Sequence, residues 1–120
     1  MAIRTHRAVA RPVTAWAGWV AGPAGWLIQH QGGSNTVFWN CALGQPWLVV
    51  TLGLVGAAVA LGGGWLSLRA VRTAGTEDSH SPGCGSQRFI GTLGALAVAI
   101  FLVVIVGQTM AGLILQGCGR

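Results

Sequence analysis

Two long stretches without a charged side chain constrain this chain more than any other feature. Trp47 to Leu68 holds 22 residues of this kind and Phe89 to Leu115 holds 27. Both exceed the roughly 20 apolar residues that a helix needs to cross a hydrocarbon core of about 30 Å. A lone strand would leave its backbone N–H and C=O groups unpaired in lipid, so we expect both stretches to be membrane-spanning helices.

A third and shorter apolar stretch, Val13 to Ile28, is followed by Gln29, His30 and Gln31. Its 16 residues reach about 24 Å as a helix, and roughly 28 Å with the three polar residues, so it just spans a hydrocarbon core. Because three arginines precede it, it also resembles a signal peptide. No A-x-A cleavage motif follows it, which favours an uncleaved membrane anchor.

The composition excludes several classes of protein. Only 8% of the 120 residues are charged and 52% are hydrophobic, whereas soluble domains carry about 25% charged residues. This excludes a soluble enzyme, a nucleic-acid binder and a disordered tail. The net charge of +5 comes from seven arginines against two acids. The arginines lie at the edges of the apolar stretches and not on one basic face, so we expect no nucleic-acid partner.

The arginines also predict the orientation. Six of the seven flank the first stretch or the segment between the other two: Arg4, Arg7, Arg11, Arg69, Arg72 and Arg88. The positive-inside rule places that side in the cytoplasm. The sequence therefore predicts an all-α, multi-pass integral membrane protein of the bacterial inner (cytoplasmic) membrane, with a cytoplasmic N-terminus and a periplasmic C-terminus. Its single membrane domain comprises a cytoplasmic segment 1–12, a span 13–31, a periplasmic loop 32–45, a span 46–68, a cytoplasmic loop 69–88, a span 89–115 and a periplasmic tail 116–120. The alternative for the first span is a helix that continues past Gln31, which would have to pass Gly32 and Gly33.

Small residues recur at helical spacing in the first two spans. They predict two helix-packing faces, formed by Gly18, Gly22 and Gly25 in one span and by Gly53, Gly56, Ala60 and Gly64 in the other. Such faces allow helix backbones to approach closely, so that dispersion holds the helices together in lipid. The alternative explanation is that glycine is simply common in this chain.

Three polar side chains fall at a similar depth near the periplasmic side. Gln29, Thr51 and Gln108 are expected to form an interhelical hydrogen-bonded cluster, in which each bond contributes about 0.6 kcal/mol. The alternative is a polar site for a quinone or a partner protein. His30 ends an aromatic stripe and could in principle bind haem, but no second membrane histidine is available as a ligand. We therefore expect no bound cofactor.

Two of the three cysteines, Cys41 and Cys118, are predicted on the periplasmic side. An oxidising compartment favours a disulfide between them. From the loop-closure entropy, this disulfide would stabilise the fold by roughly 4 kcal/mol. Free thiols and metal ligation are the alternatives, but no C-x-x-C motif supports a metal site. No acid interrupts an apolar stretch, and no nucleophile elbow, phosphate-binding loop or H-E-x-x-H motif occurs. We therefore expect the chain not to be an enzyme.

The motif Gly22-Pro23-Ala24-Gly25-Trp26 and the residues that follow it carry a resemblance. With Gln29, Gln31, Trp39, Cys41 and a final cysteine, Cys118, the chain resembles a family of small inner-membrane proteins of proteobacteria. Ser34 and Phe38 depart from a tyrosine and a proline in that pattern. Similar proteins are often encoded beside subunits of haem–copper cytochrome c oxidase. The resemblance therefore implies association with such an oxidase or with its assembly.

The leading hypothesis is a small membrane accessory subunit, or an assembly component, of a respiratory haem–copper oxidase. It would act by packing its helices against larger membrane subunits in the lipid bilayer. Two alternatives stay open. One is a small homo-oligomeric channel or transporter, and the other is a membrane thiol-redox protein that uses Cys41 and Cys118.

Overall fold

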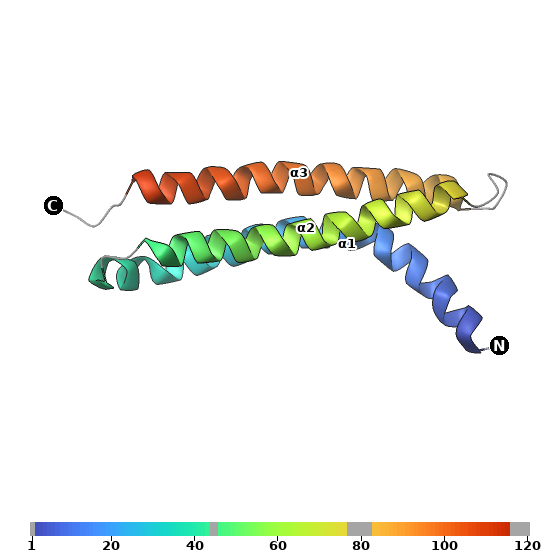
Figure 1. Cartoon of the computed structure of the whole chain (residues 1–120), viewed down its shortest axis with the longest axis horizontal. Helices are drawn as coiled ribbons and strands as arrows, with labels where there is room; N and C mark the ends of the chain where they lie inside the picture. Colours follow the sequence, from blue (N-terminus) through green and yellow to red (C-terminus); the bar gives the residue numbers. More distant parts are fainter. Residues whose placement is uncertain (1, 44–45, 77–82, 116–120) are drawn as a thin grey trace.

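The chain forms three long helices that lie side by side (Figure 1). The computed structural model describes residues 2–43, 46–76 and 83–115, with side chains for residues 13–36, 42, 46–74 and 83–115. Helix α1 covers Ala2–Leu43, α2 covers Trp47–Thr76 and α3 covers Cys84–Ile114. The bundle is elongated, with extents of 65 × 27 × 15 Å.

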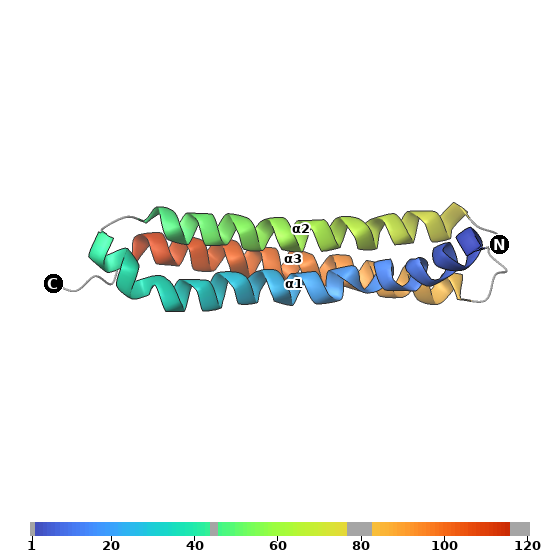
Figure 2. The same cartoon turned by 90° about the horizontal axis from the view of Figure 1, so that it is seen from below.

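The three helices alternate in direction, and each packs against the other two (Figure 2). The start of α1 therefore lies at the same end as the end of α2 and the start of α3. The end of α1, the start of α2 and the end of α3 share the opposite end. In Figure 1 the first part of α1, drawn in dark blue, turns away from the other two helices. Pro12 lies in this half of α1, and a proline inside a helix removes a backbone hydrogen bond and bends the helix.

Two of the helices are long and apolar enough to cross a membrane. Within the described residues these spans are Trp47–Ala74 in α2 and Cys84–Ile114 in α3, with mean hydropathies of 1.9 and 2.8. The described chain is thus all-helical, with two candidate membrane spans. The polar residues that end the first apolar stretch lower the hydropathy of α1, which does not meet the same criterion.

The helices extend further than the sequence predicts. The predicted loop 32–45 is helical as far as Leu43, and the predicted loop 69–88 is helical up to Thr76 and again from Cys84. The predicted cytoplasmic segment 1–12 is helical from Ala2 onwards. Gly32 and Gly33 do not stop α1. The Ser34 hydroxyl donates to the carbonyl of His30 at 2.9 Å, one turn back, which occupies that hydroxyl within the helix.

Most of the buried side chains are small, and most of the large apolar side chains lie outside. Among the buried residues are Ala15, Ala60, Ala70, Ala74 and Ser67, together with Val98 and Ile105 of α3, which form a small core cluster with Ala60. By contrast, many leucines, valines and tryptophans are exposed on all three helices, among them Val20, Leu54, Leu61, Trp65, Ile100 and Val103. A soluble protein buries such residues. This inverted distribution is the one expected where the surroundings are lipid or another apolar protein surface.

Candidate functional site

Glycine residues bring the backbones of α1 and α2 into direct contact. A Cβ atom added at Gly25 would collide with the carbonyl oxygen of Gly56, and one added at Gly56 would lie 2.5 Å from the carbonyl oxygen of Gly25. Real Cβ atoms essentially never approach another atom below 3.0 Å. The two glycines are therefore required for the observed approach of the helices. All seven residues of the two predicted packing faces are buried, and their contacts extend to α3: Gly18 beside Gly94, Gly22 beside Phe101, Gly53 beside Thr109 and Gly64 beside Val98.

Ser67 links α2 to α1 near the end where α1 starts. Its side chain is fully buried, its hydroxyl accepts a hydrogen bond from the Gly18 N–H at 2.8 Å, and it donates to the Ala15 carbonyl at 3.2 Å. A Cβ atom at Gly94 of α3 would lie 3.1 Å from the same oxygen. Three helices therefore meet at one hydroxyl group. Helical spacing places Ser67 on the small-residue face of α2, but it does not predict these hydrogen bonds.

A second group of polar residues joins α1 and α3 nearer the other end. Gln29 is 6% exposed, and its Nε2 donates a long hydrogen bond of 3.5 Å to the hydroxyl of Thr109. Thr109 uses its own proton to donate to the carbonyl of Ile105 at 2.7 Å. The hydroxyl of Thr109 can therefore only accept from Gln29, which fixes the orientation of the Gln29 amide.

Gln108, the neighbour of Thr109, contacts α1 through His30. Its Nε2 lies 3.5 Å from the Nδ1 of His30. Because an amide nitrogen only donates, Nδ1 is the acceptor in this contact. The imidazole also stacks on Trp26, with ring centroids 5.1 Å apart and planes at 12°. The indole of Trp26 in turn contacts Phe101 of α3 at a centroid distance of 6.4 Å.

We call Trp26, Gln29, His30, Gln108 and Thr109 the polar seam. It contains three buried polar atoms that have no hydrogen-bond partner: Trp26 Nε1, Gln29 Oε1 and Gln108 Oε1. One of them is a donor and two are acceptors. Since an unpaired buried polar group is costly, the seam stabilises the bundle less than its number of polar groups suggests. The arrangement holds two helices at a defined register and contains no acid or nucleophile.

The structure brings two of the three residues of the predicted polar cluster into the seam. Gln29 and Gln108 lie in the seam, each paired with a residue on the other helix. Thr51 lies elsewhere, because its side chain is exposed and donates to the carbonyl of Trp47 in its own helix at 2.8 Å. Thr51 precedes the buried Gly53 by two residues, which is about 200° around the helix. Thr109 and His30 provide the interhelical contacts in its place.

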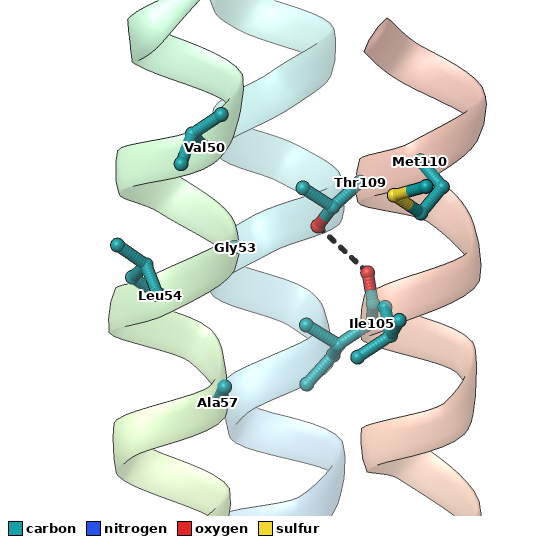
Figure 3. A pocket seen from close by; sticks show the side chains of 8 residues that line it. Val50, Gly53, Leu54, Ala57, Ile105, Thr109 and Met110 are labelled. Atoms are coloured by element: carbon teal, nitrogen blue, oxygen red, sulfur yellow. Dashed lines mark hydrogen bonds between the residues drawn. The ribbon is translucent and has the colours of Figure 1, made fainter. Parts of the chain in front are cut away.

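A shallow cavity of about 150 Å³ opens between α2 and α3 (Figure 3). Gly53 contributes no side chain there and packs directly against Thr109, whose hydroxyl is already bonded to the carbonyl of Ile105. The remaining lining is apolar and consists of Val50, Leu54, Ala57, Ile105, Val106 and Met110. The cavity therefore offers hydrocarbon contacts and no group that would orient a polar ligand.

The structure describes the side chain of only one of the three cysteines. Cys84, at the start of α3, is a free thiol. The predicted Cys41–Cys118 disulfide lies outside the described residues, since neither the side chain of Cys41 nor Cys118 is described. Within the described side chains, no three His, Cys, Asp or Glu residues are grouped so that they could hold a metal ion.

Comparison of the chain with protein-family models, with curated proteins and with solved structures gave no match.

Proposed function

We propose that the chain is a three-span membrane protein that acts through helix packing, as an accessory or assembly component of a larger membrane complex. The observation that carries the proposal is the inverted distribution of side chains. The interior is filled mostly by glycine and alanine, with Ser67, Gln29, Val98 and Ile105 beside them, while many more large apolar residues cover the outside of α2 and α3. Such an exterior fits apolar partners, which are lipid chains and the membrane surfaces of other proteins.

The proposed topology has the N-terminus in the cytoplasm and the C-terminus in the periplasm of a bacterial inner membrane. Its support is the position of the arginines relative to the bundle. Arg69 and Arg72 lie near the end of α2 and Arg88 near the start of α3, at the same end as the arginine-containing start of α1. The positive-inside rule assigns this end to the cytoplasm. In this arrangement α1 is the third span.

The proposed partner is a haem–copper oxidase. This choice rests on the sequence resemblance described above, and the polar seam is compatible with it because its residues include Gln29 and adjoin the Gly-Pro-x-x-Trp motif. Within the bundle, backbones in direct contact fill the space between α1 and α2, so a single chain provides no pore there. A channel would therefore require several copies.

The test is purification of the tagged full-length chain from its native membrane in a mild detergent, followed by mass spectrometry and reduced-minus-oxidised absorbance spectra. We expect oxidase subunits and haem absorbance to be recovered with the chain. A pure homo-oligomer without haem would contradict the oxidase proposal and favour the channel.

Two matched surface variants locate the contact. Leu54, Leu61 and Leu68 form an exposed stripe on α2, and Ile100, Val103 and Met110 are exposed on α3. Replacing either set by alanine leaves the interior unchanged. We expect one set to lower partner recovery and the other, which faces lipid, to have little effect. Unchanged recovery with both sets would refute docking through these helices.

A further inference from the structure

The basic end of the bundle carries arginines from different helices at one level. Gly18, Ser67 and Gly94 meet at the buried serine hydroxyl and therefore mark one level across all three helices. Towards the basic end, Arg72 follows Ser67 by five residues in α2, and Arg88 precedes Gly94 by six residues in α3. At 1.5 Å per residue, the two arginines lie about 8 and 9 Å from the marker level.

Arg72 and Arg88 are both exposed, and neither makes an ion pair with another described residue. In the sequence, six of the seven arginines and both acids, Glu77 and Asp78, fall in segments 1–12 and 69–88.

The distance from this level to the polar seam matches a lipid bilayer. Arg88 and Gln108 are 20 residues apart in α3, which corresponds to about 30 Å of helix. The hydrocarbon core of a typical bilayer is about 30 Å thick. Between the two levels the exposed side chains of α3 are largely apolar, among them Leu96, Ile100 and Val103. If the seam lies at one hydrocarbon boundary, Arg72 and Arg88 lie at the phosphate level of the other.

We propose that Arg72 and Arg88 form a binding surface for the phosphates of anionic phospholipid headgroups. A guanidinium group binds phosphate through two parallel N–H donors, and it keeps its charge at a membrane surface. The lipid is the favoured occupant because both arginines lie at headgroup depth in the proposed membrane placement. The inference rests on the proposed membrane placement and does not depend on the identity of the protein partner.

The experiment measures which lipids the purified full-length chain retains. The chain is equilibrated in detergent with equal amounts of phosphatidylglycerol and phosphatidylcholine, and the bound lipids are counted by native mass spectrometry. We expect the wild type to prefer phosphatidylglycerol. Each arginine at the surface is worth roughly a fivefold change in affinity, so Arg72→Gln/Arg88→Gln should lower the preference by about 30-fold. Raising the salt concentration should weaken the preference as well.

Arg120→Gln is the control. It removes one positive charge outside the two arginine-containing segments and should leave the preference unchanged. If the double glutamine variant does not fold, Arg72→Lys/Arg88→Lys keeps the charges, removes the paired donors and should lower the preference several-fold. Equal retention of the two lipids by the wild type would overturn the proposal. The same holds for an unchanged preference in the folded arginine variants.

Insertion is tested separately in phosphatidylcholine nanodiscs by co-elution with the discs and by helix content. Failure of the wild type to insert would contradict the membrane placement itself. Insertion without any lipid preference would contradict only the headgroup site.

Discussion

The contact between Gly25 and Gly56 leads to a quantitative prediction about α2. Gly56 and Gly62 lie in the same helix, and each can be replaced by alanine. A Cβ atom at position 56 would lie 2.5 Å from the carbonyl oxygen of Gly25 and 3.3 Å from the Cβ of Gln29. At position 62 no atom lies within 4 Å. Ordinary van der Waals contact starts at 3.4 Å, so only the first substitution forces the two backbones apart, by about 0.9 Å.

The size of the effect follows from two contributions. Both variants gain the same helix propensity, roughly 1 kcal/mol, when glycine becomes alanine. This gain cancels when the two variants are compared. Overpacking of a close contact costs about 1–3 kcal/mol. We therefore expect Gly56→Ala to be less stable than Gly62→Ala by about 1–3 kcal/mol, with Gly62→Ala more stable than the wild type by up to about 1 kcal/mol.

The assay is reversible unfolding of the full-length chain in mixed micelles by increasing amounts of SDS. The intrinsic fluorescence of the six tryptophans and the helix content by circular dichroism report the transition. If Gly56→Ala is as stable as Gly62→Ala or more stable, the backbone contact between α1 and α2 does not exist as described, and the packing argument fails.

Three further predictions use the same protein. Ser67→Ala should lower the free energy of unfolding by about 1 kcal/mol, because two interhelical hydrogen bonds are lost. Thr92→Ala is the control and should leave it nearly unchanged, because the Thr92 hydroxyl bonds only within α3. Equal effects of the two variants in SDS unfolding would contradict the role of Ser67 between the helices. Gln29→Met should be neutral or slightly stabilising, because it removes an unpaired buried oxygen and only a long hydrogen bond; a large loss in the same assay would show that the oxygen has a partner. In intact cells after reduction, a membrane-impermeant maleimide should label Cys41 and not Cys84, and the reverse pattern, measured by mass shift, would invert the proposed topology.

The sequence was sufficient to predict a helical chain, and the small residues that it groups on one face of each helix are buried, whereas Val98 and Ile105 were not predicted in the interior. Helical spacing alone grouped Gly18, Gly22 and Gly25, and all three are buried in the bundle. Several glycines aligned on one face let two helix backbones approach closely, whereas a single glycine between larger residues does not. The relative height of residues along neighbouring helices was predictable because the rise per residue is constant.

The partners of the polar residues could not be predicted from depth alone. Thr51 and Thr109 both lie near the level of Gln29, but only the rotation of each helix decides which hydroxyl faces inwards. That rotation follows from the glycine contacts between helices, in particular Gly53 against Thr109. The helix ends were also missed. Paired glycines such as Gly32 and Gly33 resemble a loop, yet Gly32 packs against Leu52 of α2 while the helix continues.

The backbone contact at Gly25 and Gly56 also fixes the azimuth of each helix. A helix joined to its neighbour by long side chains can rotate about its axis while those side chains change rotamer. Here no rotamers exist at the point of contact, so rotation of α1 or α2 would drive a neighbouring Cβ into the opposing carbonyl. The backbone positions that carry the outward leucines, valines and tryptophans are therefore fixed relative to one another. A surface that binds them can be matched by changes of side-chain rotamer but not by rotation of α1 against α2.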